Sequence, residues 1–506
     1  MGSFLSDREL AGLAPAERAA FHSPVPTQVV SNGEFNPLPQ TPAQRAVEAR
    51  IGEIAEQQGR RLGLDRRAFL RTGSGMAAAF LAMNEVFGPV FEVGKAEAAE
   101  PEAAAARSAA LRGQFIFDDQ LHFVRDDYPF EGLTGLARYA AEHWNPAMQK
   151  DGVGLGLARY KFENFLKEVY LDSDTRIGLL SGAPFDEPKN WFLTNDQIKQ
   201  AAETVNGIAG TRRLLFHSLV TPKQQGWMEE VDRVIAEVKP TSWKGYTIGD
   251  PLSPQTTRWP WRLDDEALMY PFYEKAVKAG ITTICIHKGL LPQDYETSIP
   301  GGAWRYANVD DVPKAAKDWP QISFVIYHAA LRAFLEDPAQ ELARFERDGY
   351  IRWVSDLAEI PRRHGISNVY ADLGTCFAIS AVSSPRFCAA MMGTLIKGLG
   401  ADHVFWGTDS VWYGSPQWQI EALRRLEIPE DMQRRHGFAP LGPAEGPVKA
   451  AILGGNAARH YGLEEKHGTL DPDALDRDGI GRIKAAYLGG GSDRSLAAYG
   501  YVVPRG

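Results

Sequence analysis

The sequence predicts an α/β protein built around one (β/α)8 barrel. Between Phe115 and Leu463, short apolar runs alternate with amphipathic stretches. Strands that alternate with helices form right-handed βαβ units and a parallel sheet, and eight such units close into a barrel. No Gly-x-Gly-x-x-Gly follows the first run, which argues against an open dinucleotide-binding sheet. The eight expected strands are Phe115–Phe117, Arg176–Leu180, Arg213–Leu219, Gly245–Ile248, Thr282–His287, Ile322–His328, Asn368–Leu373 and His403–Asp409.

Helices are expected between most of these strands. Thr194-Asn195-Asp196-Gln197 has the pattern of a capping box, which predicts the start of a helix. Met228, Val231, Val234 and Ile235 recur at helical spacing within residues 225–238. A long insertion, residues 124–175, follows the first strand; we expect it to be helical around Arg159–Val169 and to cover the active site. Further helices are expected over Asp265–Ala279, Pro338–Arg347, Ser384–Leu399 and Gln417–Leu426.

Composition and charge exclude several classes of protein. The chain has 506 residues, of which 44% are apolar and 24% charged, as in ordinary globular proteins. Its net charge of −9 and the lack of a basic stripe in the globular part argue against a nucleic-acid partner. Three cysteines, Cys285, Cys376 and Cys388, are too few and too scattered for a disulfide framework or a zinc finger.

The chain divides into three parts: residues 1–98, a barrel over residues 113–463, and a C-terminal extension over residues 464–506. In the first part, Arg66-Arg67 precedes the apolar run Gly75–Met83 and the small residues Ala96-Glu97-Ala98. This pattern resembles a twin-arginine export signal, and the apolar run is too short to span a bilayer. It predicts export through the twin-arginine machinery to the periplasm. The alternative is an amphipathic surface helix with a chance arginine pair. The rest of this part is expected to be weakly ordered, apart from a possible helix around residues 42–60.

Ligand-type side chains stand at the ends of several expected strands. Gln120 and His122 follow the first strand, and His287, His328 and Asp409 end the fifth, sixth and eighth. Alternate residues of an extended strand share a face, so Asp118, Gln120 and His122 are expected to point the same way. Catalytic residues of this fold lie at the carboxyl ends of the strands. Imidazole and carboxylate groups gathered there are suitable ligands for zinc or manganese.

These residues resemble the amidohydrolase superfamily, in particular its aminocarboxymuconate-semialdehyde-decarboxylase-like branch. The resemblance also includes Gly407-Thr408-Asp409, Leu263-Asp264-Asp265 and the closing stretch 454–463, GGNAARHYGL. It implies one divalent metal, zinc or manganese. The implied ligands are Gln120, His122, His287 and Asp409, and His328 would orient the substrate or the metal water. Gln120 departs from the family pattern, which has a histidine there.

The resemblance implies chemistry with metal-activated water. Asp409 would act as ligand, as general base, or as both, and His328 as a hydrogen-bond donor or base. A carboxamide is a poorer zinc ligand than an imidazole, but two histidines and an aspartate still make three protein ligands. The rival interpretation is a metal-free barrel in which His122, His287, His328 and Asp409 form an acid–base cluster and Gln120 holds the substrate.

Other residues are expected at the rim and the walls. We expect His217 on the third strand to contact the substrate, and Trp412 and Tyr413, just after the eighth strand, to wall the pocket. Lys244 stands before the fourth expected strand and is interpreted as a solvated rim residue. Arg212 and Arg213 begin the third strand and are expected on the surface.

Three functions follow from these expectations. The first is a metal-dependent hydrolase that cleaves a C–N or C–O bond of a small organic substrate. The second is a nonoxidative decarboxylase of a hydroxy-aromatic or unsaturated carboxylic acid, which would use the same ligands. The third is a metal-free barrel that acts as a binding protein. The partners expected are a small-molecule substrate and, as in many relatives, a second copy of the chain; the fold does not fix the substrate.

Overall fold

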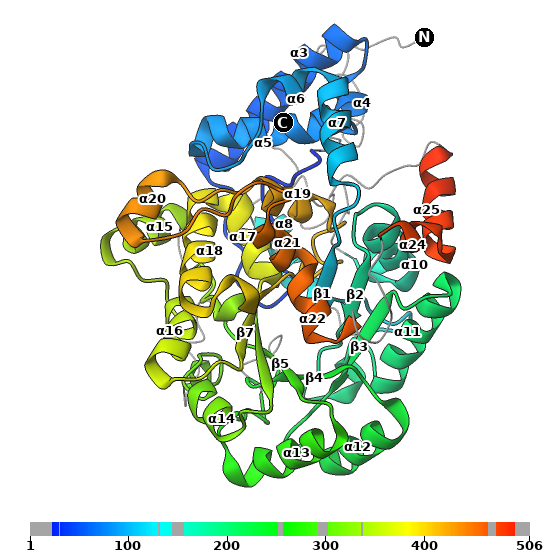
Figure 1. Cartoon of the computed structure of the whole chain (residues 1–506), viewed down its shortest axis with the longest axis vertical. Helices are drawn as coiled ribbons and strands as arrows, with labels where there is room; N and C mark the ends of the chain where they lie inside the picture. The colour runs from blue at the N-terminus through cyan, green and yellow to red at the C-terminus, as the bar shows by residue number, and fades with distance from the viewer. Residues whose placement is uncertain are drawn as a thin grey trace.

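Eight parallel strands form a nearly closed barrel, as the sequence predicts. The computed structural model describes residues 23–29, 31–129, 132–143, 156–250, 257–291, 302–334, 337–463 and 472–490. Each strand pairs with the next along the chain, in the order β1 to β8 (Figure 1). The strands are β1 (Phe117–Leu121), β2 (Ile177–Leu180), β3 (Leu214–Leu219), β4 (Ser242–Tyr246), β5 (Thr283–His287), β6 (Ser323–Tyr327), β7 (Val369–Asp372) and β8 (Val404–Phe405).

Two strands differ from their expected positions in a way that matters for the site. β1 begins at Phe117 rather than Phe115, so Asp118 and Gln120 lie within the strand. β4 begins at Ser242 rather than Gly245, so Lys244 is its central residue. The prediction of Lys244 as a solvated rim residue is therefore wrong: its side chain is completely buried.

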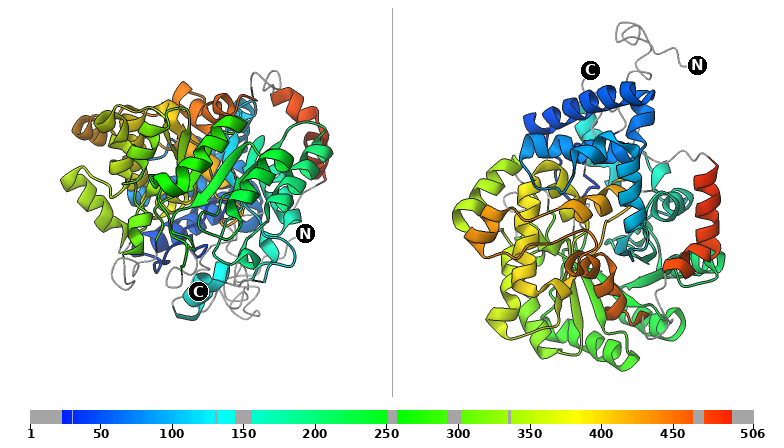
Figure 2. Two further views of the ribbon diagram at one scale, coloured as in Figure 1. Left: turned by 90° about the horizontal axis from the view of Figure 1, so that it is seen from below. Right: turned by 45° about the horizontal axis from the view of Figure 1, so that its top comes forward.

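Helices surround the barrel on its outside (Figures 1 and 2). The capping box at Thr194 is present, with Thr194 accepting a hydrogen bond from the Gln197 backbone, and it starts α11. The insertion after β1 is helical over residues 162–171, close to the expected stretch. The main flanking helices are α11 (Asn195–Ala209), α12 (Trp227–Arg233), α13 (Glu266–Ala279), α14 (Val312–Asp318), α15 (Pro338–Asp348), α16 (Val354–His364), α17 (Gly374–Ser383), α18 (Pro385–Leu399), α19 (Gln417–Arg425), α20 (Glu430–His436) and α22 (Asn456–His460).

The N-terminal part forms a helical layer on one end of the barrel, drawn in blue in Figure 1. Its first helix, over Pro42–Leu62, lies where the sequence suggests one. The apolar run that resembles the middle of an export signal lies in α5, where residues 77–80 are fully buried. Among the described residues, no helix has the length and apolar character needed to cross a membrane. The helices of this layer are α3 (Pro42–Leu62), α4 (Arg66–Leu70), α5 (Gly73–Phe87), α6 (Lys95–Ala99) and α7 (Pro101–Leu111).

A buried ion pair fastens the C-terminal helices to the barrel. α24 (Pro472–Arg477) and α25 (Gly479–Gly489) lie on the outside of the barrel (Figure 1), where α25 packs against α11 and against residues 167–171. Arg213 donates from Nε to Asp478 Oδ2 over 2.7 Å, and both side chains are at least 97% buried. Arg213 was expected on the surface; that expectation is wrong, because its guanidinium also donates to the backbone carbonyls of Arg176 and Leu475.

Candidate active site

The barrel closes between β1 and the loop after β8, and this closure brings Gln120, His122 and Asp409 together. The backbone N–H of Asp409 donates to Gln120 O over 3.0 Å, and the N–H of His122 donates to Ser410 O over 2.6 Å. Asp118 holds the same loop, since its carboxylate accepts hydrogen bonds from the backbone N–H and the hydroxyl of Thr408. Asp118 thus braces the loop that carries Asp409.

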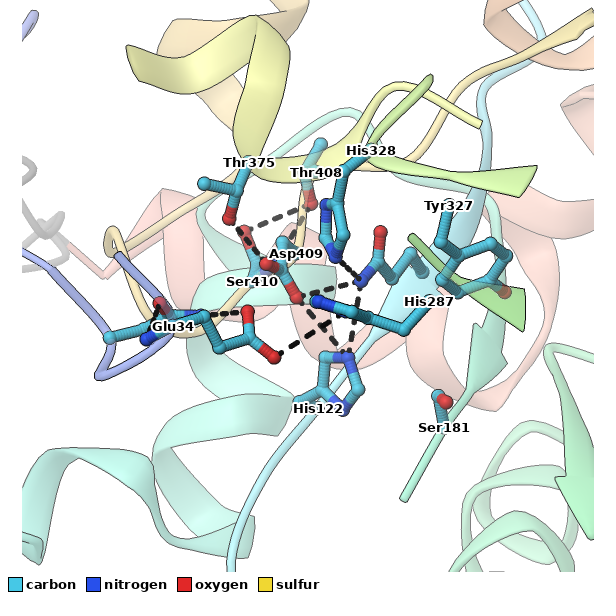
Figure 3. Close-up of polar contacts among 12 residues, drawn as sticks. Glu34, His122, Ser181, His287, Tyr327, His328, Thr375, Thr408, Asp409 and Ser410 are labelled. Carbon is cyan, nitrogen blue, oxygen red and sulfur yellow. Dashed lines mark hydrogen bonds and ion pairs between the residues drawn. The ribbon is translucent and has the colours of Figure 1, made fainter. Parts of the chain in front are cut away.

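Asp409 is the most connected side chain of the site. Its Oδ1 accepts a hydrogen bond from Gln120 Nε2 at 3.0 Å and lies 3.2 Å from His122 Nε2. Its Oδ2 accepts a hydrogen bond from the Thr375 hydroxyl at the start of α17 (Figure 3). Asp409 is 1% exposed, so these contacts act with little solvent screening. A carboxylate held in this way is a positioned proton acceptor.

The amide of Gln120 lies between the two histidines and the aspartate. Besides its bond to Asp409, Nε2 lies 3.3 Å from His328 Nε2 and 3.5 Å from His122 Nε2. Its Oε1, the atom able to bind a metal, makes no hydrogen bond with the described residues and lies against Gly374. The nitrogen cannot coordinate a cation while it donates hydrogen bonds. In this arrangement Gln120 is a hydrogen-bond donor to the site.

A second group of ligand-type atoms is offered by His287, His328 and Glu34. One atom from each lies within 4.8 Å of the other two, a spacing that suits a shared metal ion. Glu34 Oε1 lies 3.6 Å from His287 Nδ1, and the His287 and His328 rings meet edge to face at 4.7 Å. Neither ring nitrogen of His287 makes a hydrogen bond with the described residues. Unpaired buried nitrogens are what a metal site requires before the ion enters.

The backbone is strained where it presents these side chains. His328 and the two alanines after it have left-handed φ values of 60°, 46° and 54°, and Asp409 has 59°. Such conformations cost non-glycine residues of order 1 kcal/mol each and persist only when the surrounding structure imposes them. The strain falls on two predicted site residues, which is where a functional constraint would place it.

Burial sets the charge of these groups. Burial, reinforced by the charge of Lys244, lowers the pKa of His287 well below its usual value, and burial also lowers that of His328. Both imidazoles are therefore neutral at pH 7, the form that binds metals. Burial and the nearby Asp409 raise the pKa of Glu34 to about 8.

Aromatic side chains wall the site next to His122. Trp412 stacks on the His122 ring with centroids 5.4 Å apart, and Phe192 and Tyr160 each pack edge-on against Trp412 at 5.1 Å. Tyr160 belongs to the insertion after β1, which therefore contributes to this wall. Tyr413 takes a different place, since its hydroxyl lies 2.9 Å from that of Thr375 and so supports the contact between Thr375 and Asp409.

His217 and Lys244 lie inside the barrel. Both ring nitrogens of His217 are engaged, with Ser242 Oγ at 2.7 Å and the Tyr327 hydroxyl at 2.8 Å, so no polar atom remains for the expected substrate contact. Lys244 Nζ lies 3.3 Å from the centre of the Tyr327 ring, and burial lowers its pKa to about 8. Its positive charge lies near the carboxyl groups of Glu34 and Asp409.

The structure brings together His122, His287, His328, Asp409 and Gln120, all named from the sequence, and adds Glu34 and Thr375. Glu34 comes from the stretch before α3 and enters from the side of the barrel that the blue trace in Figure 3 marks. No local pattern announces it: Ser31-Asn32-Gly33-Glu34 is a turn-forming sequence far from any strand. Thr375 had a weaker signal, its place just beyond the end of the seventh strand.

A methyl group at Gly374 should disrupt this arrangement. A Cβ there would overlap Gln120 Oε1 and lie 2.8 Å from His328 Nδ1, and the φ of +48° is itself unfavourable for alanine. We expect Gly374→Ala to displace both side chains and to weaken binding of a divalent metal by about 10- to 100-fold, the typical cost of disturbing the groups that orient metal ligands. Titration with Mn²⁺, followed by electron paramagnetic resonance, measures this.

Gly365→Ala is the matched control. Gly365 also has a left-handed φ, +67°, but no neighbouring atom lies within 4 Å of the position that an alanine Cβ would take, so only the backbone strain is shared. It should lose about 1 kcal/mol of stability and keep its metal affinity. Equal metal binding by the two variants would show that close packing at Gly374 does not position the site.

A family model matches the second half of the barrel. The family model described as Amidohydrolase matches residues 252–463. This stretch contains β5 to β8 with His287, His328, Thr375 and Asp409, whereas Glu34, Gln120 and His122 lie outside it. No match is found among curated proteins.

Several solved structures are similar to this chain at low identity. An uncharacterised TIM-barrel protein from Bordetella bronchiseptica is 14% identical, with a TM-score of 0.42, covering 68% of this chain and 97% of its own. 5-Carboxyvanillate decarboxylase from Novosphingobium aromaticivorans, crystallised with manganese, is 14% identical with a TM-score of 0.40, covering 70% and 98%. A putative 2-pyrone-4,6-dicarboxylic acid hydrolase from Pseudomonas putida is 14% identical with a TM-score of 0.38, covering 69% and 98%. Residues 252–463, the half of the barrel that carries four of the site residues, are thus similar to the amidohydrolase family.

Proposed function

We propose that this protein is a metal-dependent hydrolase of the amidohydrolase family, acting on a C–N or C–O bond of a small organic substrate. One observation carries the proposal: three buried histidines and two buried carboxyl groups converge at the ends of the barrel strands, with ring nitrogens left unpaired among the described residues. A structural cluster buried this deeply would have its polar atoms hydrogen-bonded to one another.

The donor set fits a divalent metal ion. Glu34, His287 and His328 would hold it through one oxygen and two nitrogens, a mixture that suits zinc or manganese. When bound, such an ion polarises a substrate carbonyl and makes a water molecule more acidic. His122 and Asp409 would complete its surroundings on the β1 and β8 side. Gln120, which donates hydrogen bonds in this structure, would hold Asp409 in place.

The chain's own residues would then handle the protons and the substrate. Asp409, oriented by Gln120 and Thr375, would take a proton from the attacking water, and His122, 3.2 Å away, would share that charge. Trp412, Phe192 and Tyr160 would hold an apolar or aromatic part of the substrate. A flat, modest-sized amide, ester or lactone fits these requirements.

Metal content measured by mass spectrometry, on protein purified without added metal, tests the proposal. We expect about one zinc or manganese ion per chain, lost in His287→Ala and in His328→Ala. His364→Ala, at an exposed histidine on α16, is the control and should keep the metal. A chain that takes up no metal even after incubation with zinc and manganese would rule out this mechanism and favour the binding-protein alternative.

The reaction itself is distinguished in labelled water. Hydrolysis of an amide, ester or lactone in H₂¹⁸O places the label in the product acid. Release of CO₂ from hydroxy-aromatic acids without such labelling would instead identify a decarboxylase, which uses the same donor set. Both assays are run with the metal-loaded protein and with His287→Ala as the blank.

A further inference from the structure

The carboxyl group of Glu34 reaches the site from a segment that precedes the barrel by about eighty residues of chain. Its Oε1 lies 3.6 Å from His287 Nδ1 and accepts a hydrogen bond from the Tyr246 hydroxyl over 3.3 Å. Tyr246 is the last residue of β4 and His287 the last of β5. Glu34 is 6% exposed, so its side chain is part of the interior of the site (Figure 3).

Hydrogen bonds within the loop that carries Glu34 orient its side chain toward the site. Ser31 Oγ accepts hydrogen bonds from the backbone N–H groups of Gly33 and Phe35, and Gly33 has a φ of 100°. Asn32 accepts from the N–H of Glu34 and donates from Nδ2 to Glu34 Oε2 over 2.8 Å. One carboxylate oxygen is thereby held by the loop, and the other is left facing His287.

The chain between Glu34 and the barrel is anchored at several points. Phe91 pairs with Leu426 as an antiparallel bridge, extended by hydrogen bonds from Glu92 N to Arg425 O and from Glu427 N to Val90 O. The side chain of Arg425 also forms an ion pair with Glu97 and lies over the Phe80 ring at 5.3 Å. Residues 75–98 therefore form part of the packed structure of the enzyme.

The orientation of the Gln120 amide explains why the metal site takes a carboxylate from outside the barrel strands. Its oxygen faces Gly374 and its nitrogen donates to Asp409, so β1 and the residue after it contribute one ligand-type side chain, His122, rather than two. Glu34 supplies an oxygen to the same site from the opposite side, beside His287. One metal ligand is lost on the strand, at Gln120, and one is gained from the N-terminal segment, at Glu34, so the number of ligands stays the same.

We propose that the working enzyme retains residues 23–98, because this segment delivers Glu34 as a metal ligand that takes over the coordination lost at Gln120. The apolar run after the exposed Arg66-Arg67 pair then serves as a packing element of the mature protein, and a cut after Ala98 would remove a ligand. This inference rests on the metal-dependent function proposed above, and two independent readouts test it.

The first readout is metal binding by Glu34→Gln, with Glu48→Gln as the matched control. Glu48 is a buried carboxyl group in the same segment, but it accepts hydrogen bonds from Thr27 and Gln40 and lies outside the site. We expect Glu34→Gln to lower the affinity for Co²⁺ by at least about 10²-fold and to change its visible absorption spectrum, because losing even a hydrogen-bond partner of a ligand typically costs about 10- to 100-fold. Glu48→Gln should bind Co²⁺ like the wild type, and melting temperatures check that both variants fold.

The second readout is the intact mass of the metal-loaded protein recovered after expression of the full chain in a bacterium with twin-arginine export. We expect every metal-loaded species to contain residue 34. Metal-loaded protein that begins after Ala98, or a Glu34→Gln variant with wild-type Co²⁺ affinity and spectrum, would overturn the inference while leaving the metal-dependent function intact. A wild-type chain that binds no Co²⁺, zinc or manganese would instead overturn the proposed function itself.

Discussion

Asp409→Asn should abolish most of the activity while leaving the fold unchanged. The substitution keeps the shape of the side chain but removes the negative charge that Gln120, His122 and Thr375 surround. An amide cannot take a proton from water, and loss of a positioned general base costs about 10²- to 10⁴-fold in turnover. Turnover measured on the first substrate found by the labelled-water assay checks the prediction, with circular dichroism to confirm the fold.

Asp402→Asn provides the comparison for this experiment. Asp402 also lies beside a histidine, with Oδ1 3.1 Å from His403 Nδ1, but its side chain is 70% exposed at the surface of the barrel. Its removal should leave turnover unchanged. Wild-type turnover in Asp409→Asn would exclude Asp409 as the base and direct attention to Glu34 and His328.

Arg213→Met should produce the largest loss of stability among the substitutions considered. Methionine can fill part of the space of the arginine side chain, but it leaves Asp478 buried without its cation. Breaking a buried ion pair by removing one partner typically costs about 3–5 kcal/mol. The free energy of unfolding, measured in urea by fluorescence of the twelve tryptophans, gives the value directly.

Two further variants test how much of the loss of stability in Arg213→Met comes from the burial of the ion pair and how much from leaving Asp478 unpaired. Arg233→Met removes contacts to Glu230 and Asp196, but that side chain is 33% exposed, so a loss of at most about 1 kcal/mol is expected. The double variant Arg213→Met/Asp478→Leu removes both buried charges together and should recover part of the loss seen in Arg213→Met. A single variant as stable as the wild type would show that the C-terminal helices are held by apolar packing alone.

The sequence predicts most of the barrel because each strand is encoded by a short, local stretch of residues. A buried parallel strand is a short apolar run, and all eight runs appear in the chain in the order of the sheet. Errors arise where polar residues belong to the interior. Trp243-Lys244-Gly245 does not look like a buried strand, yet Lys244 fits inside the barrel because the Tyr327 ring and several carboxyl groups surround its charge. Arg213 was misplaced for the same reason, since its partner Asp478 is 265 residues away.

The site residues also fall into those that the local sequence reveals and those that it does not. His122, His287, His328 and Asp409 are recognisable because they follow apolar runs, and strand order then places them at one end of the barrel. Glu34 is not recognisable, because its place depends on how the helical layer of residues 42–99 docks on the barrel, which no local spacing encodes. The orientation of the Gln120 amide is equally non-local, since it depends on Asp409 and Gly374.

The pairing of Phe91 with Leu426 also sets an order of events during synthesis. The ion pair beside it joins residues 328 positions apart, so the N-terminal layer has no docking surface until nearly the whole barrel has left the ribosome. At about 5–20 residues per second, the apolar face of α5 waits for tens of seconds without its partner. This helix therefore stays without its partner for most of the synthesis. The active site is completed after that docking, when Glu34, made early, meets Tyr246 at the end of β4 and His287 at the end of β5.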